Sequence, residues 1–203
     1  RMTAEVRRHY DALIDENHDP FHDPPLLAAY MDKWDGQTFL DLVAPNSRES
    51  VLEIGVGTGR LAARVAPRCR MLCGIDLSPK TVCRANENLA ALPNVKIVCG
   101  DFLTYSFAET FDVIYSSLTF MHIREKRQAF ERTATLLKPG GRFVLSIDKK
   151  PETRLIYGTR VLTLYPDTPL ETEENASAAG FSLAEKVSVE FACLYVFTAK
   201  KGL

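Results

Sequence analysis

Three glycines at alternate positions, Gly55, Gly57 and Gly59, come directly after the apolar run that ends at Ile54. A glycine turn after a buried strand permits positive φ and lets a ligand approach the backbone without a Cβ in the way. In open parallel sheets, ligands bind at the carboxyl ends of the strands, where such a turn lies. The spacing therefore predicts a nucleotide-like ligand, although glycine turns also serve packing alone, so other residues must agree.

An acidic residue ends the next apolar run at a separation that suits ribose recognition. Asp76 closes the run "RMLCGID" and follows Gly55 by 21 residues. An acid about 20 residues beyond the glycines accepts hydrogen bonds from ribose hydroxyls in such folds. The alternative is an acid that only caps the helix beginning near Ser78. The strand-turn-helix setting favours the ribose role.

The elements that must position these residues alternate along the chain. Apolar runs at 50–55, 70–76, 95–100, 111–117 and 142–148 are interpreted as buried strands, and helical patterns at 58–67, 78–92 and 124–137 separate them. The "KPGG" at 138–141 is predicted to be a helix stop followed by a turn. Two final strands, 182–191 and 193–201, are expected to pair antiparallel because little lies between them. The sequence predicts an α/β fold: a Rossmann-like, doubly wound, mixed seven-stranded sheet, mostly parallel with an antiparallel C-terminal strand.

Composition excludes several classes of protein. Lys and Arg number 25 and Asp and Glu 26, so no basic excess supports a nucleic-acid partner. No apolar run is long enough for a membrane span, and the first residues are too polar for a signal peptide. The five cysteines form no C-x-x-C pair, which favours reduced thiols in a cytoplasmic protein without a metal site. The His-Asp pairs within 18–23 are interrupted by proline, which favours a rigid loop over metal ligands.

Ordered motifs over about residues 50 to 148 resemble those of class I S-adenosylmethionine-dependent methyltransferases of the small-molecule type. Glu53 precedes the glycine turn, "GIDLSP" follows the second strand, and "GDF" follows the third. "FDVIYSS" forms the fourth strand, and "LLKPGGRFVLS" leads into the fifth. The resemblance implies S-adenosyl-L-methionine as the cofactor. It also implies one domain over 1–203, with an N-terminal helical cap (1–48), a cofactor-binding core (49–148), a substrate-side insertion (149–170) and a C-terminal helix with antiparallel strands (171–203).

The same resemblance implies a role for each cofactor residue. Asp76 would hold the ribose hydroxyls, Leu77 would pack on the adenine, and Asp101 would accept from the adenine amino group. Each of these residues also has a purely structural alternative. Glu53 would only brace the loop, Asp101 would only shape its turn, and the two serines would hydrogen-bond only to the backbone. Tyr10 would be a core aromatic residue rather than a partner of the cofactor carboxylate. The cofactor residues implied are Tyr10, Glu53, Gly55, Gly57, Gly59, Asp76, Leu77, Asp101, Phe102, Ser116 and Ser117.

Methyl transfer from a sulfonium is an in-line displacement with a good leaving group, so a protein contributes mainly alignment and a dry pocket. A base is needed only where the acceptor must lose a proton. His122, just beyond the fourth strand, is the candidate base, with a packing role as the alternative. Arg154, Tyr157 and Tyr165 in the insertion are the candidate substrate-binding residues.

The acceptor is expected to be a small molecule. The turn after the fourth strand reads "YSSL" and lacks the Asn-Pro-Pro-Tyr type of motif associated with methylation of nucleic-acid bases or glutamine. A monomer or homodimer is expected. Two alternatives stay open: a non-catalytic sensor or partner protein that only binds S-adenosylmethionine, and an NAD-dependent dehydrogenase. The dehydrogenase predicts G-x-G-x-x-G, whereas Arg60 lies three residues after Gly57.

Overall fold

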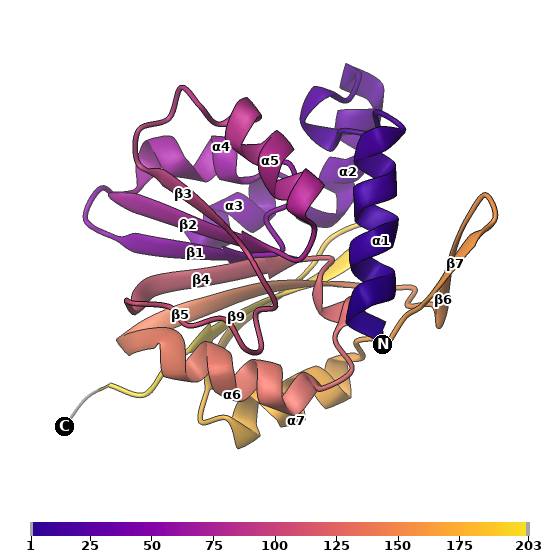
Figure 1. Cartoon of the computed structure of the whole chain (residues 1–203). Helices are drawn as coiled ribbons and strands as arrows, with labels where there is room; N and C mark the ends of the chain where they lie inside the picture. Colours follow the sequence, from indigo (N-terminus) through magenta and orange to yellow (C-terminus); the bar gives the residue numbers. More distant parts are fainter. Residues whose placement is uncertain (1, 202–203) are drawn as a thin grey trace.

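The computed structural model describes residues 2–201 and has a seven-stranded sheet at its centre (Figure 1). The strand order is β3-β2-β1-β4-β5-β9-β8. Within it, β9 runs antiparallel to both neighbours and every other pair is parallel. The strands are β1 (Ser50–Ile54), β2 (Met71–Asp76), β3 (Val95–Cys99), β4 (Phe111–Ser117), β5 (Leu137–Asp148), β8 (Ser182–Ser188) and β9 (Ala192–Thr198). The predicted mixed, mostly parallel sheet is confirmed.

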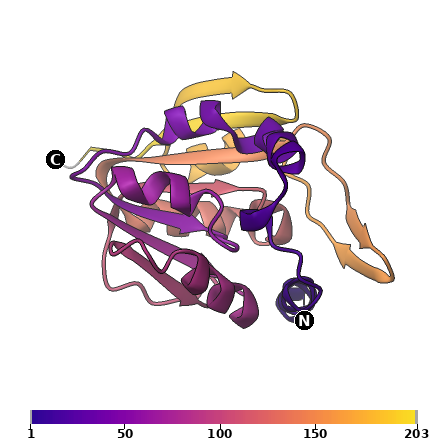
Figure 2. The same ribbon diagram turned by 90° about the horizontal axis from the view of Figure 1, so that it is seen from above.

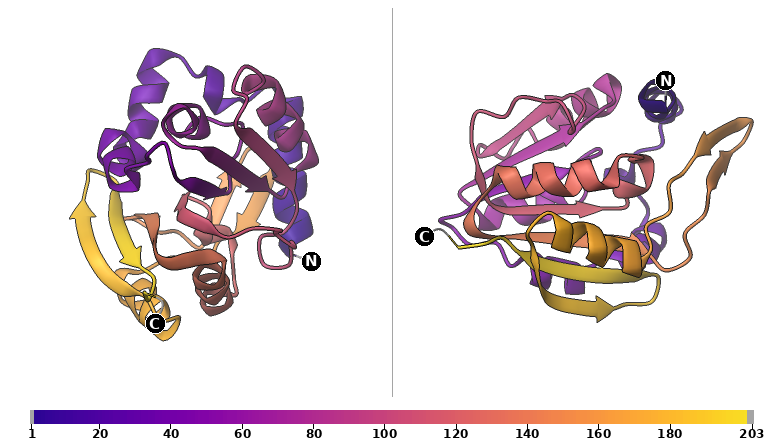
Figure 3. Two further views of the ribbon diagram at one scale, coloured as in Figure 1. Left: turned by 90° about the vertical axis from the view of Figure 1, so that its left-hand side faces the viewer. Right: turned by 90° about the horizontal axis from the view of Figure 1, so that it is seen from below.

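Helices cover both faces of this sheet (Figure 3). One face carries α3 (Gln37–Val43), α4 (Ala62–Val65) and α5 (Pro79–Asn88), and the other carries α6 (Lys126–Leu136) and α7 (Pro169–Ala178). Short 3-10 turns, η1 (Pro20–His22), η2 (Ala66–Arg68) and η3 (Phe120–His122), join the elements. The arrangement is the doubly wound layering that alternating strands and helices produce.

Side chains alternate between the two faces and form two apolar clusters. On β4, Ile114 packs into the cluster beneath α6 and α7, and Tyr115 into the cluster beneath α3 and α4. Both side chains are fully buried. Burial of the central strands on both faces explains why their sequences are almost continuously apolar.

The N-terminal region places α1 (Met2–Asp15) across the carboxyl ends of the strands, and α2 (Pro25–Asp35) follows it (Figures 1 and 2). Asp11 fixes α1 to the start of α5, because its Oδ1 accepts hydrogen bonds from the Ser78 hydroxyl and the Lys80 N–H. On α2, the ring centroids of Tyr30 and Trp34, one helical turn apart, lie 5.3 Å from each other.

Two local expectations were wrong or incomplete. The "KPGG" segment is not a turn: it is the irregular start of β5, where the register shifts between the pairs Phe111–Leu137 and Val113–Arg142. A Cβ on Gly141 would lie 2.9 Å from the Asp112 carbonyl oxygen, so glycine permits this close approach of strands. The insertion also contains an unexpected hairpin of β6 (Arg154–Tyr157) and β7 (Arg160–Thr163), which projects from the body of the molecule (Figure 2).

None of the helices within residues 2–201 combines the length and the apolar content that crossing a bilayer requires.

Candidate functional site

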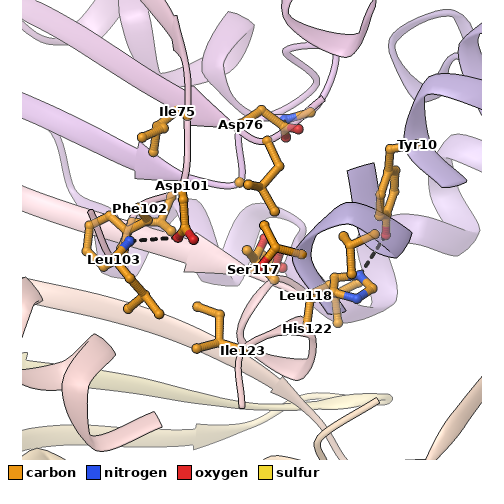
Figure 4. Close-up of a pocket in the computed structure, with 18 of the residues that line it drawn as sticks. Tyr10, Ile75, Asp76, Asp101, Phe102, Leu103, Ser117, Leu118, His122 and Ile123 are labelled. Carbon is orange, nitrogen blue, oxygen red and sulfur yellow. Dashed lines mark hydrogen bonds between the residues drawn. The ribbon is translucent and has the colours of Figure 1, made fainter. Parts of the chain in front are cut away.

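A cavity of about 240 Å³ lies where the carboxyl ends of β1, β2 and β4 meet the underside of α1. The turn after β3 closes one side, and η3 closes another (Figure 4). Of the residues with predicted cofactor or catalytic roles, those that line the cavity are Tyr10, Gly55, Gly57, Asp76, Leu77, Asp101, Phe102, Ser117 and His122. The fold thus gathers side chains that lie more than 100 residues apart in the sequence around one space.

The three glycines of the turn have different surroundings. A Cβ on Gly57 would meet no atom within 4 Å, so this position opens on free space. A Cβ on Gly55 would lie 2.0 Å from the Thr119 hydroxyl oxygen. Gly59 lies outside the cavity, and its Cβ would lie 2.8 Å from Leu89, the C-cap of α5. Gly57 alone combines positive φ (57°) with room for a ligand, whereas Gly59 serves helix packing.

Asp76 is a partly buried carboxylate beside that opening. Its Oδ2 accepts a hydrogen bond from the Gly57 N–H at 3.0 Å, and its Oδ1 accepts from the Ser78 N–H at 3.1 Å. Burial raises the pKa of Asp76, and these backbone donors oppose that shift. Ser78, not Asp76, caps α5, since its hydroxyl accepts from Thr81 N–H. Asp76 therefore braces the glycine turn while lining the cavity.

The turn after β3 supplies the opposite wall. Asp101 Oδ1 accepts a hydrogen bond from the Leu103 N–H at 2.9 Å, so the carboxylate also shapes its own turn. Phe102 is buried beside it, and the Arg132 guanidinium lies over the Phe102 ring. The wall is thus held rigid from α6, and Leu77 lines the cavity near it.

Tyr10 and His122 meet at the rim of the cavity (Figure 4). The Tyr10 hydroxyl lies 2.8 Å from His122 Nε2. Burial lowers the pKa of His122 to about 4, with contributions from nearby His9 and Lys126, so its imidazole is neutral at pH 7. Burial also raises the pKa of Tyr10. Nδ1 of His122 is buried and has no hydrogen-bond partner among the residues that the structure describes.

Ser117 takes part in a polar contact that sequence reasoning missed. Its hydroxyl donates to Oδ2 of Asp35 at 2.6 Å, and Oδ1 of Asp35 accepts from Arg60 at 2.6 Å. Asp35 is 1% exposed and ends α2. No periodicity or motif around "WDG" marks this acid, since only the fold brings α2 against the end of β4.

Besides Gly59, two predicted cofactor residues lie away from the cavity lining. The Ser116 hydroxyl donates to the Ile54 carbonyl oxygen at 2.9 Å, which is a backbone role. Glu53 is buried and accepts from the Tyr115 hydroxyl at 2.7 Å. Burial raises the pKa of Glu53 to about 8 despite that hydrogen bond. Both residues hold β1 to β4 beneath the site.

The predicted substrate residues are spread over three places. Arg154 lines a second cavity of about 170 Å³, which adjoins the first at Leu118. Tyr165 lies near α6, and its N–H donates to the Met121 carbonyl at 2.7 Å. Tyr157 is on the hairpin, where its hydroxyl lies 2.7 Å from His18 Nε2. The structure does not bring the three together.

The strand order and this cavity define a class: a doubly wound α/β domain with a cavity at the carboxyl ends of its parallel strands, where such folds bind ligands. Residues 51–141 match a family model described as a methyltransferase domain. Over these residues, which make up somewhat less than half of the chain, the sequence is thus similar to methyltransferase domains.

An uncharacterised methyltransferase of Anoxybacillus flavithermus is 37% identical over 121 residues, which cover 58% of this chain and 56% of that protein. The chain thus matches little more than half the length of such curated relatives. The solved DhpI–SAH complex is similar in fold (TM-score 0.78, 18% identity, 100% of this chain and 98% of that one). The [4+2]-cyclase SpnF has the same fold (TM-score 0.70, 18% identity, 82% of each chain).

Proposed function

We propose that this chain transfers a methyl group from S-adenosylmethionine to a small-molecule acceptor by in-line displacement. The observation that carries the proposal is the opening at Gly57 beside the Asp76 carboxylate, inside a cavity that ends at His122. The match to a methyltransferase domain supports it. The fold alone does not support methyl transfer, because the [4+2]-cyclase SpnF has a similar fold.

The residues present fit this cofactor. Asp76 has carboxylate oxygens for the ribose hydroxyls, Asp101 has one for the adenine amino group, and Phe102 and Leu77 offer apolar contact to the base. Gly57 leaves the backbone approachable for the methionine part. Tyr10 would contact the cofactor carboxylate through its hydroxyl. When bound, the cofactor supplies a sulfonium-activated methyl group.

Apart from binding, the chain contributes alignment and exclusion of water. α1 covers the cavity through Val6 and Tyr10, and Asp11 holds the helix in place against α5. A covered, largely apolar cavity removes the water that would otherwise compete for the reacting groups. We assign to His122 the acceptance of a proton from the acceptor.

The low pKa of His122 limits which groups on an acceptor it can deprotonate. At a pKa of about 4, the neutral imidazole is always ready to accept but is a weak base. It therefore suits a hydroxyl acceptor, whose proton becomes strongly acidic as the new O–CH₃ bond forms. An amine acceptor attacks as the neutral amine and needs no base in the transfer step, so a base role for His122 points to a hydroxyl acceptor.

Turnover tests the proposal. The chain is incubated with S-adenosylmethionine and panels of hydroxyl, carboxylate, amine and thiol compounds, and S-adenosylhomocysteine is measured. We expect acceptor-dependent product in the hydroxyl panel, lost in His122→Gln while S-adenosylhomocysteine binding is retained. Binding without turnover across all panels contradicts the enzyme and supports the sensor. A preference for NAD over S-adenosylhomocysteine contradicts both.

A further inference from the structure

Asp35 joins three parts of the fold behind Ser117, a residue that lines the cavity. The residue ends α2 and is almost fully buried. One carboxylate oxygen accepts from Arg60, which directly follows the glycine turn, and the other accepts from Ser117, which ends β4. Buried carboxylates are costly unless paired, and here both oxygens have a partner. The arrangement has a chemical consequence for Ser117.

Asp35 fixes the polarity of the Ser117 hydroxyl. A carboxylate paired with a guanidinium accepts hydrogen bonds and donates none, so the single proton of the Ser117 hydroxyl is committed to Asp35. Toward the cavity, Ser117 can then offer only its oxygen lone pairs. An oriented acceptor of this kind recognises a hydrogen-bond donor, such as an ammonium group, and disfavours a carboxylate.

The position of Ser117 indicates which part of the cofactor meets it. We assign Asp76 and Asp101 to the nucleoside, which leaves Gly55, Ser117 and Thr119, at and just beyond the ends of β1 and β4, to line the space for the rest of the cofactor. Tyr10, whose hydroxyl can donate, lines the rim beside His122. A donor at Tyr10 and an acceptor at Ser117 match the carboxylate and the ammonium of an amino-acid tail.

We propose that Asp35 is a positioning residue that holds Ser117 as an acceptor for the α-ammonium group of the cofactor's methionine tail. The proposal rests on S-adenosylmethionine as the cofactor and is independent of the methyl acceptor. On this proposal, the preference of the site for a ligand with a free amino group depends on the ion pair between Asp35 of α2 and Arg60, which follows the glycine turn.

Asp35→Asn tests the polarity argument. Arg60 still requires an acceptor, so the carbonyl oxygen of the new side-chain amide faces Arg60 and its NH₂ group faces Ser117. Ser117 then accepts from the amide, and its own proton points into the cavity. Calorimetry compares S-adenosylhomocysteine, its analogue without the amino group, and 5′-methylthioadenosine, which has no amino-acid tail. We expect about tenfold weaker binding of S-adenosylhomocysteine, little change for 5′-methylthioadenosine, and loss of the preference over the amino-free analogue.

Asp32→Asn is the matched control, because Asp32 also contacts Arg60, at 3.4 Å, but is half exposed and does not reach Ser117. Ser117→Ala removes the same acceptor without disturbing the ion pair, so it keeps the test valid if Asp35→Asn folds poorly. We expect Ser117→Ala to reproduce the selectivity loss, and the double variant to lose no more than the larger single loss. Equal weakening of all three ligands, or an unchanged preference for the amino group in both single variants, overturns the proposal. Failure of turnover, with these affinities as expected, contradicts only the proposed methyl transfer.

Discussion

The hydroxyl of Tyr10 lies 2.8 Å from Nε2 of His122, a contact between residues 112 positions apart that ties the covering helix α1 to the turn η3, which follows β4. The contact also bears on tautomers. If the Tyr10 proton is donated to the cofactor carboxylate, Nε2 must carry the imidazole proton and donate to Tyr10. Nδ1, buried and without a described partner, is then the free lone pair.

The first prediction concerns the protonation of His122. Its pKa in the folded protein, about 4, lies below the ordinary value of 6.5. The unfolded chain therefore binds more protons between these values, and the stability present above pH 6.5 is lost as pH falls toward 4, by about 3 kcal/mol at most. NMR titration of the imidazole should give a neutral ring throughout pH 5 to 8. His122→Gln identifies the signal and should remove this part of the acid sensitivity. A transition near pH 6.5 assigned to His122 would contradict the prediction.

Glu53 gives the opposite pH dependence. Its pKa is raised from 4.5 to about 8. Its contribution to the free energy of unfolding is therefore fully present below pH 4.5 and is lost as pH rises through 8. Glu53→Gln mimics the protonated acid. The variant should therefore gain stability relative to the unmodified protein by a few kcal/mol between pH 4.5 and 8. Urea unfolding at several pH values measures this, with the exposed Glu174→Gln as the control. A stability difference that does not change over this range argues against a buried, protonated Glu53.

Substitutions at Gly57 and Gly59 should have different effects, the first mainly on ligand binding and the second mainly on stability. Gly57→Ala places a methyl group in open space at positive φ, so we expect at least tenfold weaker binding of S-adenosylhomocysteine and about 1 kcal/mol lost stability. Gly59→Ala strikes Leu89 and should cost more stability than Gly57→Ala. Adding Leu89→Ala to Gly59→Ala removes the clash, though it also opens a cavity. Calorimetry measures the binding of S-adenosylhomocysteine, and thermal unfolding measures stability. A Gly57→Ala variant that lost stability but bound the ligand normally would contradict a ligand-binding role for Gly57.

The hairpin is expected to hold α1 in place. Arg160 donates to His9 Nδ1 at 3.1 Å and forms an ion pair with Glu16, just beyond the end of α1. Arg160→Ala should speed amide hydrogen exchange in α1 several-fold and leave exchange in β1 unchanged. Arg154→Ala changes the same hairpin away from these contacts and is the matched control. If both variants loosen α1 equally, the contact through Arg160 is not what holds it.

The sequence predicted the sheet and the residues at its carboxyl edge because both are local properties. Asp76, Asp101 and Ser117 each end or follow an apolar run, and the carboxyl ends of parallel strands meet at one edge. Once the strands are identified, the residues that follow them converge. This is why nine of the nineteen residues that line the cavity could be predicted without any knowledge of distances.

What sequence reasoning missed depends on contacts between distant segments. Asp35 reaches Ser117 across 82 residues, and nothing near Asp35 signals that approach. Gly59 shares the spacing of Gly57 yet faces Leu89, a distinction that only the position of α5 makes. The hairpin did have a signal, since Gly158 with Thr159 forms a two-residue connection between two short runs that are mostly apolar, β-branched or aromatic.

The central claim is that Asp76 binds the cofactor's ribose inside this cavity. Calorimetric titration with S-adenosylhomocysteine, on the unmodified chain and on Asp76→Ala, tests it most directly. Asp41→Ala, an exposed carboxylate paired with Gln37, is the control for the loss of one acid. We predict one site, binding weakened at least tenfold in Asp76→Ala, and no change in Asp41→Ala. Equal affinity of Asp76→Ala and the unmodified chain would contradict the account.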